Sequence, residues 1–132
     1  MVRSSRIEAV HRKGFTLVEL LVVVAIMALL LAIVAPRYFD SLDRAKEAAL
    51  KTNLRVMREA LDKYKADTGQ WPVALHMLVE ARYLQSVPAD PMTEQADTWI
   101  LTGGESSGTM GVSDVHSGAP GTGRNGVPYR QW

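Results

Sequence analysis

The sequence contains no cysteine and only three histidines among its 132 residues. A chain without cysteine forms no disulfide and no thiolate metal site. The two later histidines, His76 and His116, are too far apart in the sequence to form a local zinc-binding pair. A Walker-type phosphate loop is also missing, and Ser106 and Ser107 lie in no nucleophile-elbow sequence. These absences favour a structural protein over an enzyme.

Net positive charge is confined to the beginning of the chain. The first 14 residues hold four basic side chains, Arg3, Arg6, Arg12 and Lys13, against the single acid Glu8. The remainder has 11 basic and 13 acidic residues. No basic patch is left outside this leader, so we expect no binding to nucleic acid. Aromatic residues are few as well, and Trp71, Trp99 and Trp132 are expected in the core or at an interface rather than in a ligand cage.

One long apolar run follows the basic leader. It extends over the 21 residues from Phe15 to Ala35, which as a helix would measure roughly 31 Å and match a bilayer core of about 30 Å. A secretory signal peptide would have a shorter apolar region with a small-residue cleavage site after it, and none follows here. We therefore expect a retained single-pass span, with the basic leader in the cytoplasm and the remainder on the far side.

One acid, Glu19, interrupts this apolar run. An uncompensated carboxylate within a membrane is energetically expensive, so such a residue is by default functional and has a partner. The apolar side chains around it suit lipid and a helical bundle core equally. The run by itself therefore does not distinguish a membrane anchor from the core of a filament.

Residues 37–67 are predicted to continue the same helix with one apolar and one polar face. Apolar residues recur at three- or four-residue steps with one gap, forming a stripe of Phe39, Leu42, Ala45, Ala49, Val56, Ala60 and Tyr64. Opposite charges four residues apart form the pairs Asp40/Arg44, Glu47/Lys51, Arg55/Glu59, Arg58/Asp62, Glu59/Lys63 and Lys63/Asp67. Gly69 and Pro72 end the helix, and Pro36 predicts a kink near the outer membrane boundary.

The last third of the chain reads as a small domain. Residues 73–81 predict a short helix, and 88–91 a turn. Two apolar runs, 99–101 and 110–112, flank a glycine-rich stretch and predict a β-hairpin. From Asp114 to Trp132 the chain is rich in glycine, serine, proline and threonine and is predicted to be a loop. The fold class is therefore α+β: a long N-terminal helix with a small antiparallel sheet and loop packed on its outer half.

The junction Lys13-Gly14-Phe15-Thr16-Leu17-Val18-Glu19 resembles the prepilin signal of the type IV pilin superfamily. The resemblance implies a type IV pilin-like fold and cleavage by prepilin peptidase between Gly14 and Phe15, on the cytoplasmic side. It also implies N-methylation of the new terminus at Phe15. Glu19 would then pair with the Phe15 amino group of a neighbouring subunit, because two buried opposite charges offset each other's desolvation only in the correct register.

Motifs after residue 63 make the resemblance more specific within this superfamily. Residues 64–72, 83–84, 88–91 and 114–118 are similar to the major pseudopilins of type II secretion. This likeness implies a structural subunit of a periplasmic pseudopilus, drawn from the inner membrane and polymerised to drive protein export. The implied partners are further copies, other pseudopilins, prepilin peptidase, the inner-membrane assembly platform and lipid. Two alternatives remain: a type IV pilin or competence pseudopilin, and a membrane-anchored ligand-binding protein.

The same likeness implies that the chain has four segments. It also implies a candidate calcium site in the C-terminal loop. The segments are a removed leader (1–14), a membrane or filament-core helix (15–36), an amphipathic periplasmic helix (37–69) and a C-terminal pseudopilin domain (70–132). Major pseudopilins bind calcium in their C-terminal loop, and Asp114 and Asn125 are the matching candidates. One Asp and one Asn make a poor set for an ion that takes six to eight oxygens. The competing hypothesis is that Asp114 fixes a turn while Tyr129 and Trp132 pin the loop by packing.

Overall fold

The computed structural model of the chain describes residues 14–106 and 108–132. The leader up to Lys13, and Ser107 in the predicted hairpin turn, lie outside the described residues. The elements follow in the order α1 (Leu17–Thr68), α2 (Leu75–Glu80), β1 (Ile100–Ser106), β2 (Thr109–His116) and a 3₁₀ helix, η1 (Tyr129–Gln131). The chain divides into two compact units, one ending at Phe39 and the other spanning Asp40–Trp132. The α+β class predicted from the sequence is confirmed.

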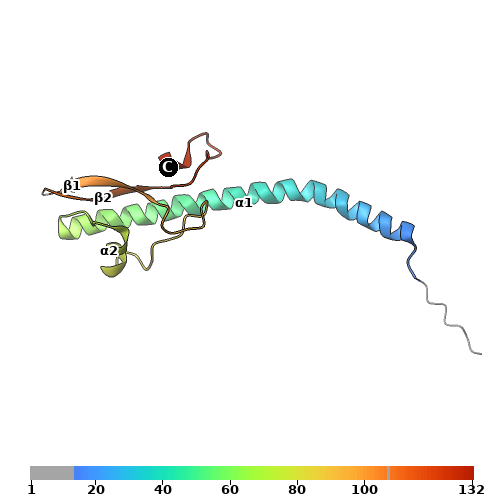
Figure 1. Cartoon of the computed structure of the whole chain (residues 1–132), viewed down its shortest axis with the longest axis horizontal. Coiled ribbons are helices and arrows are strands. Elements are labelled where there is room, and N and C mark those ends of the chain that lie inside the picture. Colours follow the sequence, from blue (N-terminus) through green and yellow to red (C-terminus); the bar gives the residue numbers. More distant parts are fainter. Residues whose placement is uncertain (1–13, 107) are drawn as a thin grey trace, which may run out of the picture. The chain divides into compact units, whose positions relative to one another are not determined.

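Helix α1 is a single element of 52 residues (Figure 1). Pro36 lies within it, and the kink expected there remains a prediction. The helix ends at Thr68 because Gly69 adopts a left-handed conformation with φ +76°. The Gly69 amide then donates to the Lys65 carbonyl at 2.9 Å and satisfies one of the carbonyls left over at a helix end.

The buried face of α1 in the C-terminal unit differs from the predicted apolar stripe. Its buried side chains are Leu50, Leu54, Met57, Ala60 and Leu61. Of the predicted stripe only Ala60 is buried and Tyr64 half-buried, whereas Phe39, Leu42, Ala45, Ala49 and Val56 are exposed. The residues Leu50, Leu54, Met57 and Leu61 also follow helical spacing, so periodicity alone did not identify which of two stripes the domain covers. The outer half of α1 thus has one covered and one uncovered apolar stripe.

The predicted charge pairs along α1 are only partly formed. Arg44 and Asp40 make an ion pair at 3.3 Å, as expected. Two other residues of the predicted charge pairs instead bond to residues distant in the sequence. Arg58 bonds to Asp114 rather than to Asp62, and Glu47 accepts hydrogen bonds from the 124–129 region. For Arg58 and Glu47, contacts with residues distant in the sequence therefore replace the weak ion pairs predicted between neighbouring turns of the helix.

The hairpin is longer than the two apolar runs that predicted it. Strands β1 and β2 pair antiparallel from Ile100 opposite His116 to Ser106 opposite Thr109, with an irregularity between Thr102 and Gly103. The first residues of the predicted C-terminal loop, up to His116, therefore belong to β2. Gly111 is required here, because a Cβ atom at this position would lie 2.6 Å from the Cβ of Trp71. Glycine, which usually weakens a strand, thus permits close packing.

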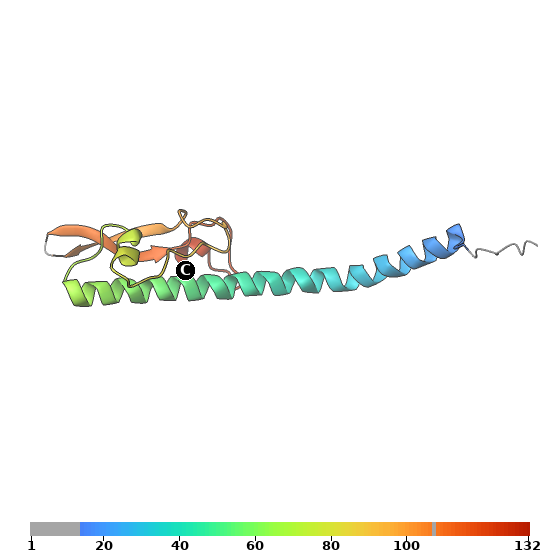
Figure 2. The same cartoon turned by 90° about the horizontal axis from the view of Figure 1, so that it is seen from below.

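The core lies between α1 and the hairpin. Figures 1 and 2 view the chain from two directions, and both show the hairpin alongside the C-terminal, green half of α1. Leu54 and Leu61 of α1 meet Leu78 of α2 together with Val112 and Val115 of β2 in one buried cluster. Trp99 is buried in this cluster, and Trp71 and Trp132 pack against it. All three tryptophans thus lie in or against the core, one of the two places predicted for them.

A buried polar contact joins the turn at 88–91 to the residues that follow β2. Asp90 and Ser117 are both fully buried, and the Ser117 hydroxyl donates to the Asp90 carboxylate at 2.5 Å. The Met92 amide donates to the other carboxylate oxygen of Asp90 at 2.8 Å. A buried carboxylate is stable only with such donors. This contact therefore fixes the path of the chain on both sides of the hairpin.

Candidate functional site

The start of α1 is an exposed segment with a self-contained helix cap. The Glu19 amide donates to Thr16 Oγ1 at 3.2 Å, and the Thr16 amide donates to the Glu19 carboxylate at 3.3 Å. This reciprocal pattern is a capping box, which satisfies amides that a helix start leaves unpaired. The spacing Thr-x-x-Glu at residues 16–19 is the local sequence signal for this cap. Glu19 therefore has a local structural role in addition to the intersubunit role predicted for it.

The predicted cleavage junction lies just before this cap. Phe15 is 90% exposed, and a Cβ atom added to Gly14 would meet no atom within 4 Å. Glycine is therefore not required at position 14 by packing within the described part of the chain. The junction is open to a peptidase, and cleavage there stays a prediction.

The apolar first part of α1 is exposed and is not covered by other described residues. Every residue from 14 to 34 is exposed, including the leucines, isoleucines and valines of the predicted span. By length and composition α1 can cross a membrane, and none of its most apolar window is buried. So large an apolar surface is not stable in water. Lipid or other helices must cover it.

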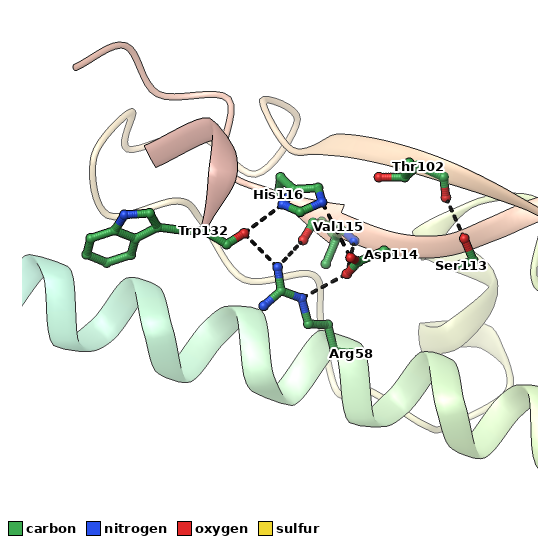
Figure 3. A network of polar contacts seen from close by, with 7 residues as sticks. All are labelled: Arg58, Thr102, Ser113, Asp114, Val115, His116 and Trp132. Carbon is green, nitrogen blue, oxygen red and sulfur yellow. Dashed lines mark hydrogen bonds and ion pairs between the residues drawn. The ribbon is translucent and has the colours of Figure 1, made fainter. Parts of the chain in front are cut away.

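The C-terminal unit contains a cluster of polar contacts in which Arg58 of α1 is the central residue (Figure 3). We call it the Arg58 cluster. Its Nε donates to Asp114 Oδ1 at 2.8 Å, and its Nη2 donates to the backbone oxygens of Val115 at 2.9 Å and Trp132 at 2.6 Å. The ring of His116 lies between two of the same acceptors: Nδ1 is 2.6 Å from the Trp132 oxygen, and Nε2 is 3.4 Å from Asp114 Oδ2. The cluster joins the helix, β2 and the end of η1.

The calcium ligands suggested by the sequence do not form a calcium site. The Asp114 carboxylate is bonded to the Arg58 guanidinium, and Asn125 Oδ1 instead accepts from the Val127 amide at 3.1 Å. A bound divalent cation would face the positive charge of Arg58 at close range. Among the described residues no group of three or more His, Cys, Asp or Glu side chains could hold a metal ion. The donor set here suits an ion pair better than calcium.

Aromatic packing holds the last residues of the chain, as the competing hypothesis expected. The rings of Tyr129 and Trp132 meet edge to face with centroids 5.1 Å apart, and both pack against the core cluster. The Tyr129 hydroxyl donates to Glu47 at 3.0 Å. Burial and the adjacent Glu47 carboxylate raise the pKa of Tyr129 above its usual value of 10.0. Asp114, by contrast, lies in β2 rather than in a turn.

Arg58 and Asp90 are important residues that sequence analysis did not single out for these contacts. The sequence pattern predicts a pair with Asp62 on the same helix for Arg58, and a turn for Asp90. Their partners Asp114 and Ser117 lie far away in the sequence. No local pattern reports such contacts, so only the tertiary structure identifies them. His116 contacts Asp114 and the Trp132 backbone oxygen, so it belongs to the same cluster as Arg58.

Comparison with known proteins gives one match to the N-terminal segment and others that extend over most of the chain. Residues 10–35 match the family model described as the prokaryotic N-terminal methylation motif. The chain is 30% identical over 127 residues to the type II secretion system core protein G of Klebsiella michiganensis, covering 89% of this chain and 87% of the relative. It is 31% identical over 129 residues to the protein of the same name from Vibrio cholerae, covering 83% and 86%.

A second group of matches is confined to a shorter stretch. A fimbrial protein of Neisseria meningitidis is 34% identical over 83 residues, which is 58% of this chain and 49% of the relative. No solved structure was found to match the fold. Core protein G relatives are thus matched over most of their length, whereas the fimbrial relative is matched over about half.

Proposed function

Since this chain belongs to the family of the type II secretion system core protein G and is a pseudopilin subunit, we propose that it polymerises into a periplasmic pseudopilus that drives protein export. The single observation that best supports this function is the match along most of both chains, which includes the C-terminal domain. The fold is consistent with it, because a structural subunit needs exposed surfaces for assembly rather than a catalytic pocket. We propose no catalytic activity for the chain.

Processing is the first step of the proposed function. Prepilin peptidase cleaves between Gly14 and Phe15, and the new amino group on Phe15 is methylated. The exposure of Phe15 and the open space around Gly14 support this step. The match to the N-terminal methylation motif covers the same residues. The proposed segments are accordingly a leader to residue 14, a span at 15–36, an outer helix at 37–69 and a domain at 70–132.

Registration is the proposed task of Glu19. In the single chain its carboxylate bonds only to Thr16 among the described residues, and its side chain is exposed within an apolar segment. A bare carboxylate in such surroundings requires a cationic partner. Cleavage creates one at Phe15, and we assign Glu19 to the Phe15 amino group of the neighbouring subunit. A wrong register would leave both charges unpaired.

Helix packing then builds the filament. The bare apolar segment before residue 35 supplies one surface for neighbouring copies of α1. The uncovered stripe of Leu42, Ala45, Ala49 and Val56 supplies a second surface on the same helix. These positions follow a three- and four-residue spacing with one gap between Ala49 and Val56, and the two alanines permit close approach of a second helix. We propose that both surfaces are covered in the assembled pseudopilus.

The proposed location is the bacterial inner membrane, with the N-terminus cytoplasmic and the C-terminal unit periplasmic. The partners are other copies, other pseudopilins, prepilin peptidase, the assembly platform and lipid, with no nucleic acid. The sequence has no Walker-type loop, so a separate motor supplies the energy of ATP. Pilin-like and ligand-binding functions remain the alternatives.

Deletion of the gene tests this function, with exported proteins in the culture supernatant and twitching motility measured in the same strains. We expect loss of several exported proteins with motility intact, and restoration by the wild-type gene. Loss of filaments or twitching with normal export would instead identify a type IV pilin. Loss of neither, together with a ligand-dependent rise in the melting temperature, would favour the ligand-binding alternative.

A further inference from the structure

The Arg58 cluster gathers chain segments in the way that a bound cation does. Three oxygen atoms approach one guanidinium within 2.9 Å: a carboxylate oxygen of Asp114 and the backbone oxygens of Val115 and Trp132 (Figure 3). The carboxylate and one carbonyl belong to β2, and the other carbonyl follows η1. A guanidinium presents several donors in one rigid plane, and it can therefore serve oxygens from different segments together.

The Asp114 carboxylate already has a nitrogen partner at each of its oxygens. One carboxylate oxygen, Oδ1, accepts from Arg58 Nε and from the Val115 amide, both at 2.8 Å. The other oxygen, Oδ2, faces His116 Nε2 at 3.4 Å. Arg58 occupies the Oδ1 side of this carboxylate, and its positive charge would repel a calcium ion brought to the same group. The observed ion pair therefore disfavours calcium at Asp114.

We propose that Arg58 is a built-in cation that replaces calcium in fastening the C-terminal segment to α1. Its charge is permanent and covalently attached, so this fastening does not depend on a dissolved ion. The half-exposed Arg58–Asp114 pair is not sufficient by itself, because ion pairs of this kind contribute little. The hydrogen bonds to the two backbone oxygens supply the remaining stabilisation, because they hold β2 and the C-terminal segment to the same side chain. This inference does not depend on the filament function.

The test uses the full chain in detergent micelles and measures local opening of the C-terminal segment. Trypsin cleavage after Arg124 and Arg130 is followed by mass spectrometry, and the melting temperature is followed by circular dichroism. Each measurement is made with a calcium chelator and with millimolar calcium. We expect identical cleavage rates and melting temperatures in the two conditions. A lower melting temperature, or faster cleavage, in the chelator would overturn the proposal.

Variants test whether Arg58 itself does the fastening. Arg58→Met is expected to raise the cleavage rate at Arg130 about tenfold, because cleavage follows the population of the locally opened segment. Arg58→Lys keeps the charge but not the fork of donors, so it should lie between wild type and Arg58→Met and remain folded. Arg55→Met is the matched control, since Arg55 is exposed on the same helix and has no ion pair among the described residues. A cleavage rate for Arg58→Met equal to those of Arg55→Met and wild type would refute the role of Arg58.

Discussion

At the scale of single residues, Glu19 combines two tasks that can be separated experimentally. It caps its own helix through Thr16, and we propose that it pairs with a neighbouring amino group. Capping requires only a side-chain oxygen at position 19, whereas pairing requires a negative charge. A glutamine satisfies the first requirement but not the second. The two roles therefore predict different results for different substitutions.

We predict that Glu19→Gln and Glu19→Ala are both processed but assemble poorly, because each removes the charge. Thr16→Ala is expected to assemble, because it removes the cap and keeps the carboxylate. Its loss of the cap should cost about 1 kcal/mol of helix stability. Periplasmic filaments released from spheroplasts and processed subunits are compared by immunoblot. Normal assembly of Glu19→Gln would show that the charge is not needed for registration.

Tyr129 predicts how stability depends on alkaline pH. Burial raises the pKa of its phenol, and the Glu47 carboxylate raises it further. A raised pKa means that the folded state favours the protonated phenol, so its stabilising contribution is complete below the ordinary pKa of 10.0 and is lost as the pH rises through the folded value. Tyr83 also has a raised pKa, through its hydrogen bond to Asp67. A single substitution separates the two tyrosines.

We expect Tyr129→Phe to lower the melting temperature near neutral pH, because the hydrogen bond to Glu47 is lost. It should also flatten the decline in melting temperature above about pH 10. Circular dichroism of the full chain in detergent over this pH range provides the measurement. Tyr38→Phe is the control, since Tyr38 is an exposed phenol. An equally steep alkaline decline in Tyr129→Phe and wild type would contradict the assignment to Tyr129.

At the scale of elements, α1 shows that apolar spacing does not by itself identify the covered face of a helix. Leu54 and Val56 are two residues apart, yet Leu54 is 2% exposed and Val56 41% exposed. Residues two apart on a helix point in different directions. The domain covers the stripe that contains Leu54. The stripe that contains Val56 is left for another molecule, as the proposed assembly requires.

The two stripes predict opposite effects of substitution. Leu54→Ala should destabilise the subunit by about 2–5 kcal/mol, because it leaves a cavity in the core. Val56→Lys should change subunit stability by less than about 0.5 kcal/mol, as is usual for surface positions. The same Val56→Lys substitution should nevertheless lower filament yield, because it introduces a charge into the proposed helix contact. Melting curves and the yield of periplasmic filaments released from spheroplasts check both statements, and a normal filament yield for Val56→Lys would exclude this stripe from the contact.

At the scale of the whole molecule, the chain combines a water-stable domain with a segment that water cannot accommodate. The C-terminal unit has its own core, whereas residues 14–34 have no buried side chain. Only lipid or a bundle of helices can cover such a surface. In the proposed assembly, polymerisation transfers this segment from lipid to a bundle of helices. We propose that, before this transfer, the basic leader determines which side of the membrane each end occupies.

We predict that Gly14→Asp retains the leader, because the peptidase must approach the backbone at position 14. The unprocessed subunit should remain in the membrane with its C-terminal unit outside, since the basic leader still sets the orientation. Mass spectrometry measures leader retention, and trypsin treatment of spheroplasts tests orientation. A mature-sized product from Gly14→Asp would refute the cleavage site. Protection of the C-terminal unit from trypsin would refute the orientation.

The sequence alone determined the long helix and the α+β class. It did so because hydrophobic periodicity and helix-ending residues such as Gly69 act over a few neighbouring positions. The cleavage junction and the role of Glu19 also rest on local sequence, and they stay predictions. Tertiary structure alone decided which stripe of α1 is buried, and it paired Arg58 with Asp114 and Asp90 with Ser117. Such contacts join residues distant in the chain, and they depend on how the hairpin packs against the helix.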